Sequence, residues 1–363
     1  MPSADPPGPS PVPPPTRLPR WLTSPLAGLY AAEIGRRNRR FDRGIGVTRL
    51  DRPVISVGNL SSGGTGKTPL VRWVVSEIQD AGHRPVVAMR GYKARPDRPS
   101  DEEREHREAM PSVPVVADPR RAVALRSFFA TPEGATRDCV VLDDGFQHRR
   151  LARDLDIVLV DASRPPDRDS LLPAGHLREP PGSLSRADVV VLTHAELVAP
   201  EEARRVERAV REAAARDLVV AVAEHRWTGL LRSDTPGDAP GDLSWLAGRR
   251  VIGACAIGHP EGFFAALEWA NAQCVARCVR RDHDPFAPAT VRRIAELAET
   301  TQAEAVVVTA KDWVKLRRHA DMLPRLVVVP VLGLGFQRGA CEVRKALRCV
   351  LRQKTDIANN PCE

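Results

Sequence analysis

The feature that most constrains this chain is a glycine-rich segment, GNLSSGGTGKTP, at residues 58–69. An apolar run at 54–57 precedes it, and residues 67–79 follow it with the apolar spacing of a helix. A strand, a glycine-rich turn and a helix in this order can bind phosphate, because backbone N–H groups and the positive end of the helix then surround the anion. The residues predicted to contact nucleotide phosphates are Ser61, Ser62, Gly63, Gly64, Thr65, Gly66, Lys67 and Thr68.

One position departs from the strict pattern of such a loop, because Ser61 stands where a glycine is expected. Gly63 and Gly64 supply flexibility nearby, and Lys67 is one of only six lysines among the 54 basic residues. In a working loop, Lys67 reaches the β- and γ-phosphates and the Thr68 hydroxyl ligates Mg²⁺. The alternative at this point is a glycine-rich turn without a chemical role.

The alternation of apolar runs with helical stretches predicts the fold class. Short, continuously apolar runs are typical of parallel strands that are buried on both faces of a sheet. We therefore predict an α/β fold like that of P-loop NTPases, with a mostly parallel sheet flanked by helices and a second, smaller α/β lobe. The predicted strands lie at 54–57, 85–89, 139–142, 157–160 and 189–192 in the first domain and at 251–256, 274–279, 305–309 and 326–331 in the second.

Composition also predicts how the chain is divided. Nine of the 33 prolines fall in residues 1–20, which indicates a disordered tail, and residues 232–243 are rich in Gly, Pro and Asp, as in a linker. The predicted parts are a tail at 1–20, an amphipathic helix at 21–45, a nucleotide-binding domain at 46–228, a linker at 229–245, a smaller lobe at 246–353 and a tail at 354–363. Helices of the smaller lobe are expected at 261–271, 288–300 and 341–353.

Two adjacent carboxylates support the phosphate loop. The apolar run at 139–142 leads directly into Asp143, Asp144 and Gly145. A strand that ends in Asp at the carboxyl edge of a parallel sheet places a carboxylate where a nucleotide-bound Mg²⁺ is held. The alternative is an ordinary Asp-Gly turn. With a phosphate loop upstream, we interpret Asp143 and Asp144 as metal ligands.

The positive charge of the chain is concentrated near its N-terminus. The formal net charge is +8, and residues 17–52 contain nine Arg and no Lys against three acidic residues. Ser24 and Pro25 indicate a helix start, and apolar residues with helical spacing follow, next to the run RRNRR at 36–40. An apolar stripe beside clustered arginines is typical of a helix that lies on an anionic membrane surface. A helix docked on its own domain fits the pattern equally well.

Composition argues against several classes of protein. No apolar run reaches 18 residues, so no membrane-spanning helix is expected, and no secretory signal pattern is present. Seven widely spaced cysteines are no disulfide framework. Aromatic residues make up only 4%, which argues against stacking on single-stranded nucleic acid, so no nucleic-acid partner is expected.

Five segments together carry a resemblance to a known family. GNLSSGGTGKTP, RGY, DDGFQHRRLARDLDIVLVDA, LLPAGHLREP and VTAKDWVKL occur in this order, and the chain resembles tetraacyldisaccharide 4′-kinases from about residue 21 to residue 350. The resemblance implies transfer of the γ-phosphate of ATP, with Mg²⁺, to the 4′-hydroxyl of a tetraacylated glucosamine disaccharide 1-phosphate, a lipid A precursor. It also implies a peripheral enzyme at the cytoplasmic face of the bacterial inner membrane, held there by its N-terminal helix. We expect a monomer.

The resemblance also assigns roles to individual residues. It makes Lys67 the phosphate lysine, Thr68, Asp143, Asp144 and Glu179 the metal ligands, and Arg178 a phosphate contact. It further makes Asp101 the catalytic base and His283, in Asp-His-Asp, its partner. The chain departs from the family pattern at Lys93 and Ser100 and in the charged stretch EEREHREAM.

Two other functions are compatible with the motifs. One is a P-loop enzyme that acts on a small soluble acceptor, such as a carboxylate ligase or a GTPase. A GTPase is disfavoured because the chain has no Asn-Lys-x-Asp guanine signature, and residues 309–312 read TAKD. The other is a nucleotide-binding protein of the membrane surface with a degenerate site. Turnover of ATP that depends on a lipid acceptor would separate the kinase from both.

Overall fold

The structure is a computed structural model that describes residues 19–62, 65–91, 100–235, 240–258, 260–281, 284–323 and 326–359. Within these ranges, only the backbone is described for Arg20, Asp101 and residues 353–359. The chain forms two compact units, of which unit 1 comprises Met1–Glu224 with Leu334–Glu363 and unit 2 comprises His225–Gly333. The proline-rich tail predicted at 1–20 lies outside the described residues up to position 18.

Unit 1 is built on a parallel sheet, as predicted. Its strands follow the order β3-β2-β4-β1-β5-β6-β7, and neighbouring strands in this order are parallel. The central strands are buried along their whole length, which explains their continuous apolar sequences. The strands are β1 (Val54–Asn59), β2 (Pro85–Met89), β3 (Val115–Ala117), β4 (Cys139–Asp143), β5 (Leu155–Asp161), β6 (Val189–Thr193) and β7 (Val219–Arg232).

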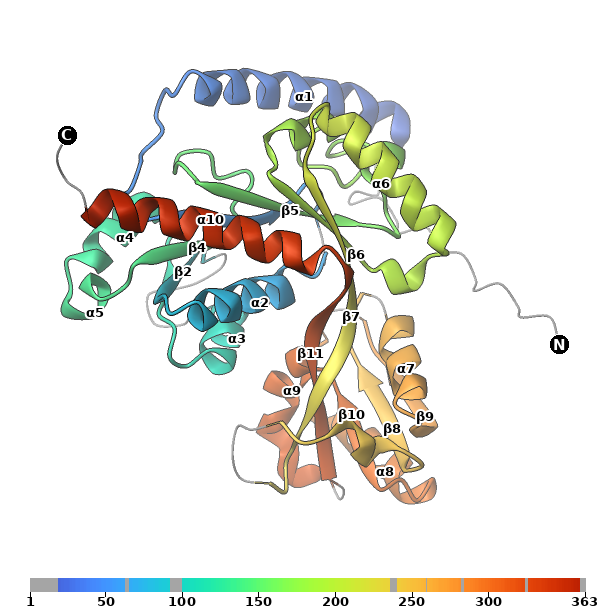
Figure 1. Cartoon of the computed structure of the whole chain (residues 1–363). Helices are drawn as coiled ribbons and strands as arrows, with labels where there is room; N and C mark the ends of the chain where they lie inside the picture. Colours follow the sequence, from blue (N-terminus) through green and yellow to red (C-terminus); the bar gives the residue numbers. More distant parts are fainter. Residues whose placement is uncertain are drawn as a thin grey trace. The chain divides into compact units, whose positions relative to one another are not determined.

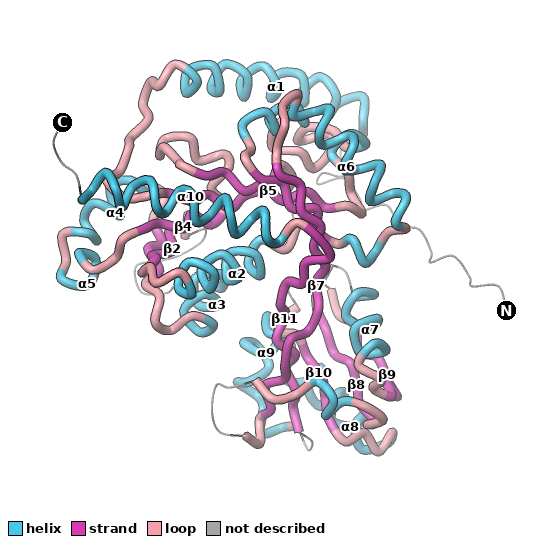
Figure 2. Tube along the Cα trace, viewed as in Figure 1, coloured by secondary structure: helices cyan, strands magenta, loops and turns pink. Residues whose placement is uncertain are grey.

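Helices cover both faces of this sheet (Figure 1, Figure 2). On one face, α2 and α10 share a core with inward-facing residues of β1, β2, β4 and β5. On the other face, α6 packs over β5 and β6, and α4 packs over β2 and β4. The helices of unit 1 are α1 (Arg20–Asp42), α2 (Lys67–Asp80), α3 (Asp101–Ala109), α4 (Arg121–Phe129), α5 (Pro132–Ala135), α6 (Pro200–Ala214) and α10 (Ala340–Asn359).

Unit 2 contains a smaller set of parallel strands of the same type. Its strand order is β11-β10-β8-β9, and the helices α7, α8 and α9 surround it (Figure 2). The predicted strands and the two predicted helices at 261–271 and 288–300 are present with small changes of boundary. The elements are β8 (Arg250–Cys255), α7 (Pro260–Trp269), β9 (Gln273–Val279), α8 (Pro288–Thr300), β10 (Ala305–Val308), α9 (Ala310–Leu316) and β11 (Leu326–Arg338).

The structure corrects three predicted boundaries. Unit 2 ends at Gly333, whereas the smaller lobe was predicted to reach residue 353, because α10 buries Val343, Leu347 and Leu351 in the core of unit 1. The helix also continues to Asn359, into the predicted tail at 354–363. The predicted linker at 229–245 begins inside β7, which runs to Arg232, and part of it, 236–239, lies outside the described residues.

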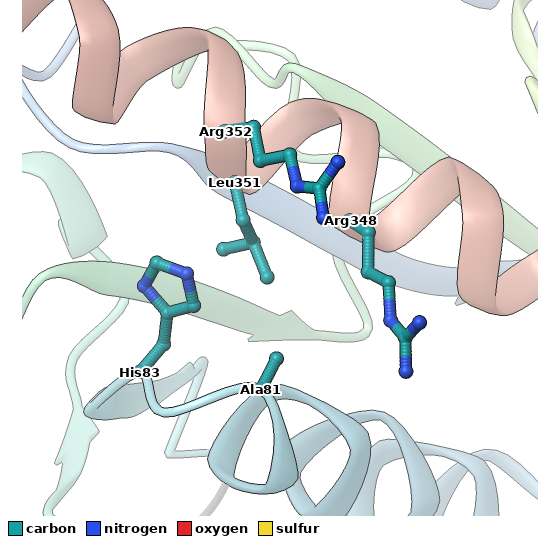
Figure 3. A pocket seen from close by; sticks show the side chains of 5 residues that line it. All are labelled: Ala81, His83, Arg348, Leu351 and Arg352. Carbon is teal, nitrogen blue, oxygen red and sulfur yellow. The ribbon is translucent and has the colours of Figure 1, made fainter.

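A small hollow lies between α10 and the C-terminal end of α2. Its volume is about 210 Å³, and it is lined by Ala81, His83, Arg348, Leu351 and Arg352. Figure 3 shows the two arginines leaving α10 beside Leu351, with His83 and Ala81 opposite. The hollow is at the end of α2 remote from the glycine-rich loop.

The N-terminal helix begins earlier than predicted. It starts at Arg20, because the amides of Leu22 and Thr23 already donate to the Pro19 carbonyl, so Ser24 is not its N-cap and Pro25 lies inside it. The two halves of the helix differ in exposure. Its first half exposes large apolar side chains, while Ile34 in its second half is only 7% exposed. Among the described residues, no helix is long and apolar enough to cross a membrane.

The position of α10 in the core of unit 1 gives a first prediction. We expect Leu347→Ala to lower the free energy of unfolding of unit 1 by about 2–5 kcal/mol, since it removes a side chain that is 2% exposed and leaves a cavity. Urea unfolding followed by circular dichroism measures the change. Arg348→Ala, one position further along the exposed side of α10, serves as control and should cost about 0.5 kcal/mol or less. An unchanged midpoint for Leu347→Ala would contradict the assignment.

Candidate active site

The glycine-rich loop connects β1 to α2, as its sequence predicts. Gly66 caps α2 with a φ of +81°, a left-handed conformation that glycine adopts without steric cost. Thr65 is buried, and its hydroxyl accepts a hydrogen bond from the Asn59 side chain at 2.8 Å. Its carbonyl accepts another from the Thr193 hydroxyl at the end of β6, at 3.0 Å. The loop is therefore fixed to two strands. Lys67 and Thr68 begin α2, whereas Gly63 and Gly64 lie outside the described residues.

A second segment, residues 171–179, pairs with this loop. The Ser62 amide donates to the His176 carbonyl at 2.7 Å, and the Arg178 amide donates to the Leu60 carbonyl at 2.7 Å. Ser61 and Leu177 form an antiparallel bridge between these contacts. The motif LLPAGHLREP thus pairs with the loop through an isolated bridge and two flanking hydrogen bonds, which its sequence alone did not indicate. This pairing holds Arg178 and Glu179 at a fixed distance from the phosphate-binding backbone.

Asp144 joins the predicted site residues into one cluster. The guanidinium of Arg178 donates to both of its carboxylate oxygens, at 2.9 and 2.7 Å, and the Lys67 ammonium lies 3.9 Å from Oδ1. The buried Arg121 of α4, which sequence analysis missed, donates to the Asp144 carbonyl at 3.1 Å. Asp144 itself has a φ of +52°, an unfavourable conformation for a residue with a side chain. These contacts hold it in that conformation.

The charges around Asp144 keep its carboxylate ionised. Burial raises the pKa of Asp144, but the positive charges of Lys67 and Arg178 outweigh that effect, and the net pKa lies below its ordinary value. The group is therefore an anion with two cationic partners. An anionic ligand in this place would compete with Asp144 for Lys67 and Arg178.

Asp143, the other predicted metal ligand, has a partner that sequence analysis missed. The Nε2 atom of His106 lies 2.8 Å from Asp143 Oδ2, and the His106 side chain is fully buried. His106 shares the buried face of α3 with Glu103 and Met110, at helical spacing. The sequence offered one signal for this contact, namely a histidine on the inward face of a short, charged helix. The contact between His106 and Asp143 fixes α3 to the end of β4.

Glu179, the fourth predicted metal ligand, is also fully buried. Its Oε2 accepts hydrogen bonds from Arg186 at 2.9 Å and from the Asn38 side chain of α1 at 2.8 Å. Its Oε1 has no hydrogen-bond partner. The negative charge of Glu179 is thus compensated by the guanidinium of Arg186 and the amide of Asn38. The Oε1 atom can still accept hydrogen bonds.

The structure does not describe the side chains of the predicted acid–base pair. Asp101 is the first residue of α3, after Ser100, whose hydroxyl caps the helix by accepting from the Glu103 amide at 3.1 Å. Only the backbone of Asp101 is described, and His283 lies outside the described residues. Their predicted roles stay predictions.

The donors at this sheet edge fit a Mg²⁺ ion. The Thr68 hydroxyl and the carboxylates of Asp143 and Asp144 are hard oxygen ligands, and Mg²⁺ in nucleotide sites takes one or two carboxylates together with phosphate oxygens and water. Within the described part of the chain, no three His, Cys, Asp or Glu side chains converge as an all-protein metal cage. The residues present suit an ion that arrives with nucleotide phosphates.

The contact between His106 and Asp143 generates a prediction about stability. His106→Leu leaves a buried carboxylate without its hydrogen bond, which should lower the free energy of unfolding by about 1–3 kcal/mol. His106→Gln can place an amide donor near the Nε2 position and should cost less. Urea titration of both variants measures the difference. Equal stability of the Leu and Gln variants would show that the hydrogen bond is not responsible.

Comparison with known proteins agrees with this geometry. The family model of tetraacyldisaccharide-1-P 4′-kinase matches residues 19–342. A tetraacyldisaccharide 4′-kinase from Anaeromyxobacter sp. (strain K) is 36% identical over 341 residues, which cover 89% of this chain and 88% of that protein. One from Chlorobaculum parvum is 32% identical over 370 residues, covering 95% of this chain and 98% of that protein.

A solved structure gives the same result. The "apo" form of LpxK from Aquifex aeolicus in complex with ATP matches with a TM-score of 0.71 and 27% identity, over 92% of this chain and 99% of that chain. The fold prediction is thereby confirmed, and so is the family to which the motifs pointed. The chain belongs to the tetraacyldisaccharide 4′-kinase family.

Proposed function

We propose that the chain is an ATP-dependent kinase that phosphorylates the 4′-hydroxyl of a tetraacylated glucosamine disaccharide 1-phosphate, a lipid A precursor. Membership in the family supports the reaction. The observation that carries the proposal is the cluster in which Lys67 and Arg178 meet at Asp144 beside the phosphate loop. Two cations that share one carboxylate partner can turn toward a phosphate chain without leaving a charge uncompensated.

Phosphoryl transfer depends mainly on positioning and on neutralising charge. The phosphate loop and the N-terminus of α2 would bind the β- and γ-phosphates of ATP. Lys67 would reach both of these phosphates. Arg178 would leave Asp144 and bind an oxygen of the transferred phosphoryl group. Its side chain is already close, because Arg178 and Lys67 share Asp144 as their partner. These exchanges keep every charge paired while the nucleotide binds.

The same step would make Asp144 available to the metal. Thr68, Asp143 and Asp144 would hold Mg²⁺, with Glu179 close to Arg178 as a further carboxylate. When bound, the ion neutralises charge on the phosphates and aligns them. His106 holds Asp143 by one oxygen, Oδ2.

The 4′-hydroxyl must lose its proton as it attacks phosphorus, and the resemblance assigns this to Asp101, with His283 as its partner. The position of Asp101 at the start of α3 supports the first assignment, because α3 is joined through His106 to Asp143. A base on this helix has a fixed relation to the end of β4.

The proposed acceptor is a lipid, and α1 suits a membrane surface. Trp21 and Leu29 are 73% and 69% exposed, and Leu22 and Leu26 are exposed beside them. Exposed aromatic and aliphatic side chains on a helix rich in arginine bind an anionic interface. We infer peripheral attachment of a monomer at the cytoplasmic face of the bacterial inner membrane.

The catalytic proposal predicts a large loss of activity in Lys67→Ala. Removal of a charge that acts on the transferred phosphate should lower kcat at least about 100-fold. The assay follows incorporation of labelled γ-phosphate into the tetraacylated disaccharide 1-phosphate, and Asp101→Ala is measured beside it. Lys345→Ala, on α10, is the control and should retain parental activity. Vesicle binding without acceptor-dependent turnover in the parent would identify a nucleotide-binding protein of the membrane surface instead.

The membrane proposal is tested by Trp21→Ser combined with Leu29→Ser. Each large apolar side chain that leaves water contributes about 1.5–3 kcal/mol, so the double variant should bind anionic vesicles at least about tenfold more weakly. Co-sedimentation with vesicles that contain phosphatidylglycerol measures the affinity. Val123→Ser, an exposed apolar residue on α4, is the control. Unchanged binding of the double variant would remove α1 from the membrane contact.

A further inference from the structure

From Tyr30 onward, α1 contacts the Arg178–Glu179 step directly. The Tyr30 hydroxyl donates to the Arg178 carbonyl at 3.0 Å, and the Asn38 side chain donates to Glu179 at 2.8 Å. Tyr30 and Asn38 are eight residues apart on one helix and reach two successive residues of the segment. The contacts are distant in sequence, because 148 and 141 residues separate the partners.

We propose that Tyr30 and Asn38 are positioning residues, through which α1 holds Arg178 and Glu179 in the arrangement that phosphoryl transfer requires. The inference rests on the proposed function and deepens it. It gives the N-terminal helix a part in the reaction besides attachment to a surface. Neither residue touches the nucleotide; both act through the backbone and side chain that they hold.

The hydrogen bonds of Arg178 show why its carbonyl matters. Its amide is bonded to the Leu60 carbonyl of the phosphate loop, and its guanidinium is bonded to Asp144. Its carbonyl is the third point of attachment, and Tyr30 supplies that bond. When the guanidinium leaves Asp144 for a phosphate, only the two backbone contacts still fix the residue. Tyr30 then provides one of the two.

Burial makes the contact at Glu179 equally specific. The carboxylate is 0% exposed, so each hydrogen bond that compensates its charge counts strongly. Arg186 and Asn38 both donate to Oε2 and leave Oε1 without a partner. Asn38 is therefore one of the two donors that engage Oε2 and fix the orientation of the carboxylate. Without its amide, the carboxylate can rotate or move toward Arg186.

The helix is rigid enough to position another segment, because the segment DDGFQHR at 143–149 fixes it in turn. The Arg149 guanidinium donates to the Asn38 carbonyl at 3.1 Å and to Asp42 at 2.6 Å, and Arg37 donates to the Gln147 carbonyl at 3.2 Å. The Gln147 side chain donates to the carbonyl of Asn59, the last residue of β1, at 2.9 Å. The second half of α1 is thereby tied to the same strand end as the phosphate loop.

The test compares Tyr30→Phe and Asn38→Ala with the parent in the full chain. Tyr30→Phe removes one hydroxyl and keeps the ring, and we expect kcat to fall about three- to tenfold. Asn38→Ala removes a bond to a buried charge, and we expect a fall of at least about tenfold. The KM for ATP should change less than about twofold, because the phosphate loop is untouched. Glu33→Ala, exposed on the same helix, is the matched control and should keep the parental kcat.

Amide hydrogen exchange gives a readout that does not depend on activity. In both variants the amides of Ser62, Leu177 and Arg178 should exchange faster, while those of the buried strand β5 keep the parental rate. A general loss of stability would accelerate β5 as well. Asn38→Gln, which keeps an amide on a longer side chain, should recover part of the protection.

The outcomes separate this inference from the proposed function. A parent that fails to phosphorylate the lipid acceptor overturns the proposed function. An active parent with Tyr30→Phe and Asn38→Ala both at parental kcat and parental exchange overturns the inference. A lower kcat with unchanged KM and local acceleration of exchange supports it. A rise in the KM for ATP alone also overturns it, since α1 would then act on binding.

Discussion

The salt bridge between Asp144 and Arg178 is the interaction on which the site depends. It joins the end of β4 to the segment that pairs with the phosphate loop, and Lys67 approaches the same carboxylate from the start of α2. Three separate parts of unit 1 thus meet at one charge. Because all of them are fixed to neighbouring parallel strands, the cluster needs little rearrangement to accept a phosphate chain.

Electrostatics explain why this arrangement of charges is stable. A buried cation or anion alone is costly, and each charge of the cluster has a partner of opposite sign. The low pKa of Asp144 expresses the same balance, because the two cations outweigh its burial. When ATP binds with Mg²⁺, phosphate would replace Asp144 as the anionic partner of Lys67 and Arg178. Each ion pair would thus be replaced by another ion pair. The site changes partners without creating an isolated charge.

Much of the fold and part of the site follow from local sequence. The apolar runs are strands because both faces of the sheet are covered, and the loop before Lys67 requires the left-handed Gly66. Contacts between distant segments left no such local pattern. The sequence around His106 is strongly charged and indicates an exposed helix, whereas His106 is buried against Asp143. Helix α10 was assigned to the wrong unit, because its apolar stripe does not specify which core it enters.

The N-terminal helix shows the same limit most clearly, because its sequence supported two interpretations equally. In the structure, one part of the helix is docked and another part is exposed. Trp21, Leu26 and Leu29 are exposed, whereas Tyr30 and Asn38 bond to the segment that carries Arg178. An apolar stripe indicates only that one side of a helix avoids water. The groups that dock α1 are a hydroxyl and an amide, which are polar and so are not part of such a stripe. The exposed apolar part of α1 and the part that contacts the active-site segment therefore belong to one continuous helix, so a force applied at one end can be transmitted to the other.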